Sequence, residues 1–281
     1  MRYDILHRTR YTYAAPVRDS HNDVRLQPMP IPEQQVESFL LKVLPAVRLT
    51  HYTDFYSNWV NHFEIHEAHS SLLIEAQSRV VTKPAPPLPA EKLCSFERMK
   101  DAPNIERCFD YIQTSRFVEI TPEAWKMALD ATDGTDDAWL AVLALMKFVN
   151  GYLKYESNST NVHTHMAEVI KDRRGVCQDF AHLMLGLCRS LKIPARYVSG
   201  YLATEAASAT HAWTEVFIPG HGWRGIDPTH NCQLNETYVK LANGRDYADA
   251  LPISGNYFDV NPTGNKLERK MTVEVKITPL T

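Results

Sequence analysis

The chain has 281 residues, a length that suits one or two domains. Hydrophobic residues make up 44% and charged residues 22%, as in ordinary soluble globular proteins, and the net charge of −3 lacks the strongly basic character of a nucleic-acid binder. No run of about 18 apolar residues could span a membrane, and charges interrupt the N-terminus as they do not in a signal peptide. We therefore expect a cytoplasmic protein with no membrane or nucleic-acid partner.

Residues 1–82 have the alternation of β-strands, with apolar or aromatic side chains at every second position. About four strands cannot easily bury both faces of a sheet, so this β-rich N-terminal domain should pack against another part of the chain. The expected strands are 3–13, 36–43, 59–65 and 72–81.

Five prolines interrupt residues 83–103, which we interpret as a connector because proline resists both helix and sheet. The period then becomes helical. Thr121-Pro122 begins one helix, Asp136-Asp137 begins another, and a third runs from near Cys177 to about Lys192.

Strand patterns return after the third helix, so residues 104–281 form a second domain with helices on a sheet. The last alternating segment, 270–278, has no partner within that domain and could return to the N-terminal domain. The expected strands of the second domain are 197–202, 212–218, 223–227 and 270–278.

Three short segments carry candidate chemistry. Cys177 follows Gly175-Val176 at a helix start, where the helix dipole favours a thiolate and unpaired backbone N–H groups could hold an oxyanion. His211 begins a strand after the small residues 206–209, and Asp227 ends a strand before a proline. A thiol, a base and an orienting acid are the parts of a covalent acyl-transfer site.

These segments, with 193–201 and 244–249, resemble the transglutaminase-like superfamily, whose core has a Gly-x-Cys helix start, a His-Ala-Trp strand and an Asp-Pro-Thr strand. The β-rich region resembles the one preceding this core in bacterial members, often labelled cysteine proteases. The resemblance implies an α+β, papain-like core in which a helical layer packs on an antiparallel sheet. It also implies a catalytic triad of Cys177, His211 and Asp227.

By that resemblance, Cys177 forms a thioester with a peptide or protein amide, His211 moves protons, and Asp227 fixes the His211 tautomer. Hydrolysis is the preferred outcome, and protein-glutamine transglutaminase activity is the alternative. A non-catalytic binding module would be expected to lack a triad residue, and a peptide:N-glycanase would usually carry zinc-binding Cys-x-x-Cys pairs. The sequence has all three triad residues and no such pairs.

The remaining candidates have weaker support. Gln178 and Tyr155 could supply a second oxyanion donor. Trp213 could line the substrate cleft, although core packing is the default interpretation of a tryptophan there. We expect no cofactor and no metal site, because the histidines at 62, 66, 69, 163 and 165 fit strand and loop positions, and Asp130, Asp133, Asp136 and Asp137 fail the calcium-loop spacing. The five cysteines should be free thiols, with Cys188 buried, Cys94 and Cys108 exposed, and Cys232 in a loop.

Overall fold

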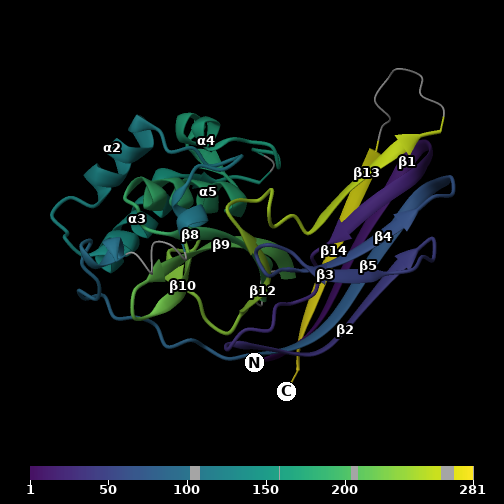
Figure 1. Cartoon of the computed structure of the whole chain (residues 1–281), viewed down its shortest axis with the longest axis horizontal. Coiled ribbons are helices and arrows are strands. Elements are labelled where there is room, and N and C mark those ends of the chain that lie inside the picture. The colour runs from purple at the N-terminus through teal and green to yellow at the C-terminus, as the bar shows by residue number, and fades with distance from the viewer. Residues whose placement is uncertain (102–107, 158, 204–207, 261–268, 281) are drawn as a thin grey trace.

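The computed structural model describes residues 1–281 except 102–107, 158, 204–207, 261–268 and 281. It has two lobes: a rounded lobe of helices and sheet, and an elongated β-lobe beside it (Figure 1). This α+β architecture agrees with the fold class predicted from the sequence. Among the described residues, no helix is long and apolar enough to cross a membrane.

The β-lobe is a seven-stranded antiparallel sheet organised around β1, the N-terminal strand. One side of β1 pairs with β5 and, further along, with β4. The other side pairs with the C-terminal strands β14 and then β13. The register along β1 shifts between Thr12 and Val17 and again between Arg18 and His21. The strands are β1 (Arg2–Val24), β2 (Gln34–Leu44), β3 (Thr50–Thr53), β4 (Trp59–Ile65), β5 (His69–Thr82), β13 (Ile253–Asp259) and β14 (Arg269–Leu280).

The C-terminus completes the β-lobe. β14 pairs with β1 from Arg2↔Leu280 to Tyr13↔Arg269, so the first and last strands of the chain lie side by side. β13 continues along β1 from Val17 to Val24. No alternation in the sequence predicted β13, because Ser254, Gly255 and Asn256 interrupt its apolar pattern.

The rounded lobe has a five-stranded antiparallel sheet in the order β11-β10-β9-β8-β12, and α5 packs on β8 and β9. Helices α2, α3 and α4 pack around α5. The bounds are α2 (Pro122–Ala131), α3 (Ala138–Tyr152), α4 (Met166–Asp172), α5 (Cys177–Ser190), β8 (Ala195–Ala203), β9 (Ser208–Ile218), β10 (Gly222–Asp227), β11 (Cys232–Gln233) and β12 (Tyr238–Gly244), with a short parallel pair, β6 (Lys154–Tyr155) and β7 (Arg174–Gly175), and the 3-10 turns η1 (Arg98–Lys100) and η2 (Phe109–Ile112).

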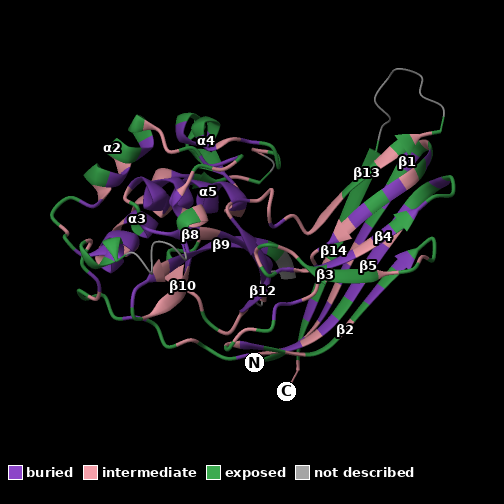
Figure 2. Ribbon diagram, viewed as in Figure 1, coloured by how far each residue is buried: buried purple, intermediate pink, exposed green. Residues whose placement is uncertain are grey.

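Local sequence signals explain the helix starts. Thr121 caps α2 by accepting a hydrogen bond from Ala124 N at 3.1 Å, and Pro122 is the first helical residue. Asp137 caps α3 through Trp139 N and Leu140 N at 2.9 and 3.1 Å. α5 is buried from Gln178 to Ser190, and Figure 2 shows it as the buried centre of the lobe.

The proline-rich connector is attached to the rounded lobe and does not hang free. The backbone of Leu88 exchanges two hydrogen bonds of 2.8 Å with the Gln233 side chain, and Trp139 Nε1 donates to Pro89 O at 2.8 Å. The expectation that Cys94 and Cys108 are exposed is wrong, since both side chains are buried. Asp137 accepts from Cys94 N at 2.6 Å and so fixes this part of the connector beside α3.

Buried amide side chains join the two lobes. The side chain of Asn58 in the β-lobe makes two hydrogen bonds with the backbone of Asn243 in β12. Asn243 N donates to Asn58 Oδ1, and Asn58 Nδ2 donates to Asn243 O, both at 2.8 Å. Gln34 pairs with the backbone of Lys240 in the same way, at 2.8 and 2.9 Å. Because buried amides need partners, these contacts fix one relative position of the lobes.

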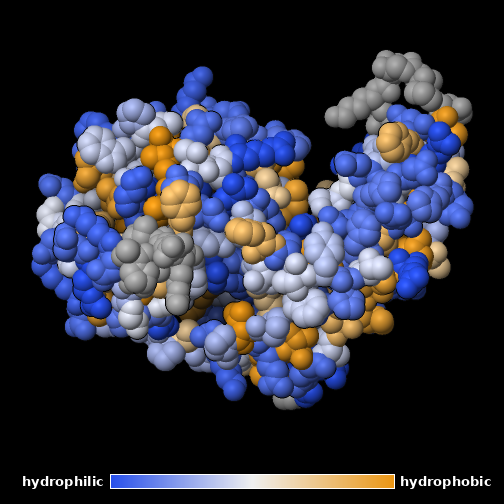
Figure 3. All heavy atoms as spheres, viewed as in Figure 1, coloured by the Kyte–Doolittle hydropathy of each residue, from blue (hydrophilic) through white to orange (hydrophobic). Residues whose placement is uncertain are grey.

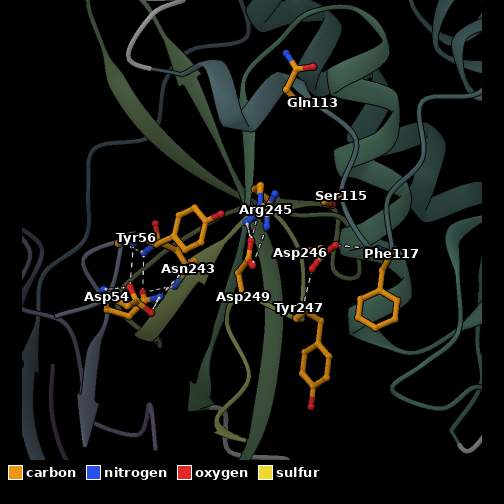
Figure 4. A network of polar contacts seen from close by, with 12 residues as sticks. Asp54, Tyr56, Gln113, Ser115, Phe117, Asn243, Arg245, Asp246, Tyr247 and Asp249 are labelled. Atoms are coloured by element: carbon orange, nitrogen blue, oxygen red, sulfur yellow. Dashed lines mark hydrogen bonds and ion pairs between the residues drawn. The ribbon is translucent and has the colours of Figure 1, made fainter. Parts of the chain in front are cut away.

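A turn after β12 extends this interface (Figure 4). Arg245 donates from its backbone N and from Nε to Asp249 Oδ2 at 3.0 and 2.9 Å, and Asn243 Nδ2 donates to Tyr56 O at 3.1 Å. Asp246 accepts from Phe117 N at 2.8 Å. The segment 244–249 therefore links the β-lobe, the sheet and the segment before α2.

Candidate active site

Cys177 is the first residue of α5, as the sequence predicted. Asp179, fully buried inside the first turn, accepts hydrogen bonds from Val176 N at 2.7 Å and Thr160 Oγ1 at 2.6 Å. Burial nevertheless raises the pKa of Asp179. Gly175 leaves room for this carboxylate, because a Cβ there would lie 2.5 Å from Asp179 Cβ. Asp179 thus holds the turn that presents the nucleophile.

His211 lies on β9, opposite Gly200 of β8, and its ring is largely buried. Nε2 lies 2.8 Å from Asp227 Oδ2, which leaves Nδ1 for the thiol. Burial alone would lower the pKa of His211, but hydrogen bonds to Asp227 and Cys177 outweigh it and raise the pKa to about 9. His211 is therefore an imidazolium near neutral pH, with a proton to donate.

Asp227 ends β10, is fully buried and accepts five hydrogen bonds. Oδ1 accepts from Thr229 N at 2.8 Å and His230 N at 3.2 Å. Oδ2 receives His211, His230 Nδ1 at 2.7 Å and Tyr238 Oη at 2.8 Å. Burial would raise the pKa of Asp227, but its hydrogen bonds to the two histidines and the tyrosine hold it well below its ordinary value. The carboxylate stays charged and fixed against the ring.

The chain matches two family models. The model of the transglutaminase-like superfamily core matches residues 126–228, and that of the bacterial transglutaminase-like N-terminal region matches residues 3–81. The chain belongs to the transglutaminase-like superfamily. The core model includes Cys177, His211 and Asp227, and the N-terminal model ends within β5.

Relatives of this superfamily member span nearly its full length. An uncharacterized protein of Mycobacterium tuberculosis is 31% identical over 274 residues, covering 90% of this chain and 87% of the relative. An uncharacterized protein of Mycobacterium leprae is 29% identical over 264 residues, covering 91% and 93%. A crystal structure from Cytophaga hutchinsonii, described as a "putative cysteine protease", superposes with a TM-score of 0.79 at 24% identity, covering 100% of this chain and 92% of that one. That likeness establishes the shared fold.

In this transglutaminase-like chain, the candidate nucleophile Cys177 lines a cavity of about 310 Å³ between the two lobes. The rounded lobe contributes Cys177, Gln178 and His211, and the β-lobe contributes uncharged side chains of β1 and β14. Figure 3 shows the β-lobe standing beside the rounded lobe with a notch between them. The other lining residues are His7, Thr9, Tyr11, Val162, Val176, Tyr197, Ser199, Thr210, Ala212, Tyr247, Pro252, Ile253, Met271 and Val273.

The structure places the three weaker substrate-binding candidates in different surroundings. Gln178 lines the cavity, where its Nε2 donates to Val162 O at 3.4 Å. Tyr155 lies near Cys177 but is half exposed and outside the described lining of this cavity. Trp213 also lies outside that lining, and its burial agrees with core packing, the default interpretation of this residue. It is buried behind His211, stacked on that ring at 6.4 Å and edge-on to Tyr238 at 5.4 Å.

Sequence reasoning missed two residues that hold Asp227, namely His230 and Tyr238. His230 directly follows the Asp-Pro-Thr motif, so its position was a usable signal. Tyr238 comes from β12, at the opposite edge of the sheet order from β10, and no spacing predicts this contact. Cys232 also lies here, with Sγ 3.5 Å from Tyr238 Oη, and burial raises the pKa of its thiol.

Cys188 is fully buried, as expected, and burial raises the pKa of its thiol to about 12. Two groups in the described part of the chain have ligand atoms close enough to hold a metal ion: His211, Asp227 and His230, and, in the β-lobe, His21, His62 and Glu64. In the first group Nε2 of His211 and Nδ1 of His230 both face Asp227 Oδ2, so the geometry supports orientation of the catalytic ring.

Proposed function

We propose that this protein catalyses acyl transfer from an amide bond through a thioester on Cys177, with hydrolysis of a peptide or amide as the outcome. The observation that carries the proposal is one continuous arrangement: a helix-start cysteine, a histidine hydrogen-bonded to it, and a buried carboxylate on the other ring nitrogen. A non-catalytic role would not require a charged histidine beside the thiol inside a cavity.

The steps follow from the positions of these groups. The Cys177 sulfur attacks the carbonyl carbon, and the developing oxyanion lies near the Cys177 N–H, one of the helix-start donors without an intrahelical acceptor. The His211 imidazolium gives its proton to the leaving amine as the C–N bond breaks. Neutral His211 then takes a proton from water, which attacks the thioester and releases the acid. Asp227 keeps one tautomer and one ring orientation throughout.

The cavity suggests the substrate class. Apart from two histidines, the described residues that line it include no lysine, arginine, aspartate or glutamate. Apolar and aromatic side chains predominate. An amide substrate with uncharged side chains near the scissile bond suits such a wall. The β-lobe forms part of this wall, so we propose that it takes part in substrate binding.

Amine acceptance is the alternative outcome. A Pseudomonas aeruginosa protein-glutamine gamma-glutamyltransferase is 37% identical over 68 residues, but the match covers 21% of this chain and 10% of that protein. The catalytic groups are the same for water and amine acceptors, so the acceptor must be determined by experiment.

One experiment tests both outcomes. The full chain is incubated with a library of amide-containing peptides in H₂¹⁸O, with and without a primary amine, and products are identified by mass spectrometry. Solvent ¹⁸O in a new carboxylate supports hydrolysis, and the amine's added mass supports transglutamination. Cys177→Ser is the control. Absence of both products, together with failure of a peptidyl electrophile to label Cys177, would overturn the proposal.

A further inference from the structure

Three histidines surround one glutamate on the surface of the β-lobe. Glu64 Oε1 lies 3.0 Å from His21 Nδ1 and 3.4 Å from His62 Nε2, and Glu64 Oε2 lies 3.4 Å from His66 Nε2. All four side chains are partly exposed. A single surface glutamate normally pairs with one cation, so three imidazoles around it need a further explanation.

The register of the sheet sets this arrangement. His21 of β1 is directly opposite Glu64 of β4, and Asp23 is directly opposite His62. Side chains alternate between faces, so these four share one face of the sheet, while Phe63 on the other face is buried. His66 directly follows the end of β4. No local pattern marks His21 as a partner, because 41 positions separate it from His62.

The outer nitrogens of two of these rings are already held. His62 Nδ1 lies 2.9 Å from Asp23 Oδ1, and His66 Nδ1 lies 3.4 Å from Asp19 Oδ1. Each ring therefore has one nitrogen on an aspartate and the other directed at Glu64. Metal-binding histidines show this pattern, because a carboxylate on the far nitrogen fixes the tautomer and leaves the near nitrogen's lone pair for the ion.

The separations also suit one ion. With zinc–nitrogen bonds of about 2.0–2.1 Å, neighbouring ligand atoms of a tetrahedral site lie about 3.3 Å apart. Two of the contacts reach the same oxygen, Glu64 Oε1: His21 Nδ1 at 3.0 Å and His62 Nε2 at 3.4 Å. The three ligand atoms of His21, His62 and Glu64 all lie within 4.8 Å of one another.

We propose that His21, His62 and Glu64 bind a divalent transition metal ion of the zinc class, with His66 beside the site on the other oxygen of Glu64. Asp23 and Asp19 orient the His62 and His66 rings. This proposal departs from the expectation, drawn from the sequence, that these histidines form no metal site. His69 does not belong to it: that residue is buried, and its Nδ1 lies 3.0 Å from Glu67 O.

The proposed site borders the notch between the lobes. His21 and His62 line a cavity of about 590 Å³, to which the rounded lobe contributes Arg116 and His163. This cavity and the one at Cys177 share lining residues, among them Tyr11, so the two hollows adjoin. A metal ion here would link β1 to β4. It would lie in the cavity that adjoins the one at Cys177.

The test uses the full chain carrying Cys177→Ala, so that the reactive thiol does not contribute. Zinc is titrated calorimetrically, and cobalt(II) is titrated by visible absorption. We expect one ion per chain, a cobalt spectrum without thiolate charge transfer, and at least tenfold weaker binding in His62→Ala. Asp23→Ala should weaken binding by about 10–100-fold, as expected for a residue that orients a ligand.

Two variants serve as matched controls. His51→Ala removes an exposed histidine of β3 that is paired with Asn61, on the opposite face from His62, and should leave binding unchanged. His230→Ala tests the other candidate group beside the triad and should also bind normally. No binding by the parent, binding unaffected by both His62→Ala and His21→Ala, or binding lost in His230→Ala would each overturn the proposal. These readouts do not depend on catalytic activity.

Discussion

His230 Nδ1 lies 2.7 Å from Asp227 Oδ2, the same oxygen that lies 2.8 Å from His211 Nε2. One carboxylate oxygen therefore orients two imidazoles, with Tyr238 as a third donor. These hydrogen bonds keep Asp227 charged and hold it in one position. The charge and the orientation of both imidazoles therefore depend on this one carboxylate.

Asp227→Asn should therefore reduce turnover far more than stability. The amide keeps the size of the carboxylate but removes the charge that stabilises the His211 imidazolium, and loss of the matching residue in serine proteases costs about 10⁴-fold. We expect a fall in kcat of about 10²–10⁴-fold, with a circular dichroism spectrum like that of the parent. Asp130→Asn, on the exposed face of α2, is the matched control. Unchanged kcat in Asp227→Asn would remove this residue from the catalytic machinery.

Cys177 should be the fastest of the five thiols to react with iodoacetamide at neutral pH. Its partly exposed sulfur faces the cavity beside a charged histidine, whereas Cys94, Cys108 and Cys188 are buried. Cys232 is the competitor, and burial raises the pKa of its thiol. Peptide mass mapping of briefly alkylated, folded protein measures the order. Faster labelling of Cys232 would contradict the assignment of the nucleophile.

Protonation of His211 should make stability depend on pH. Its pKa rises from about 6.5 in the unfolded chain to about 9 in the folded one, so folding takes up a proton in that interval. The stabilisation is fully present below pH 6.5 and is lost as pH rises through about 9, by at most about 3 kcal/mol. Denaturant unfolding of the parent and His211→Gln at several pH values isolates this slope. Equal slopes between pH 6.5 and 9 would show that the ring is not charged in the folded protein.

Gly175→Ala should destabilise the helix start. The added methyl would meet Asp179 Cβ at 2.5 Å and Oδ2 at 2.6 Å, so the carboxylate that accepts from Val176 N must move. We expect a loss of about 1–3 kcal/mol in unfolding free energy and slower alkylation of Cys177. Gly151→Ala near the end of α3 is the control, because its Cβ meets nothing within 4 Å and alanine favours a helix by up to about 1 kcal/mol. Equal effects of the two substitutions would refute the steric argument.

Asn58→Ala should weaken the joint between the lobes. It leaves the Asn243 backbone N–H and carbonyl oxygen without their side-chain partner in a buried interface, which costs about 1–3 kcal/mol for each unsatisfied group. Thermal and denaturant unfolding measure the loss. Asn256→Ala, at an exposed position of β13, should change stability by less than about 0.5 kcal/mol. A similarly small change in Asn58→Ala would mean that the amide pair does not hold the lobes together.

The sequence by itself determined the local features of this protein. Helix starts at Thr121, Asp137 and Cys177 follow from capping chemistry and side-chain period, which act between neighbours in the chain. The order Cys177, His211, Asp227 was also readable, because each residue lies in a short motif with its own strand or helix signal. The relation of His211 to Asp227 followed, since they are on adjacent antiparallel strands.

Only the tertiary structure decided which distant side chains meet. Tyr238 reaches Asp227 from another strand, His21 meets Glu64 across a register set by the bulges in β1, and the last strand β14 lies beside the first and forms a wall of the Cys177 cavity. Trp213 belongs to the same His-Ala-Trp motif as His211, yet it lies behind the site. Side chains two residues apart on a strand share a face of the sheet but contact different residues. Such contacts depend on strand register and on how the lobes pack. Both are set by interactions between residues far apart in the chain, so the spacing of neighbouring residues does not predict them.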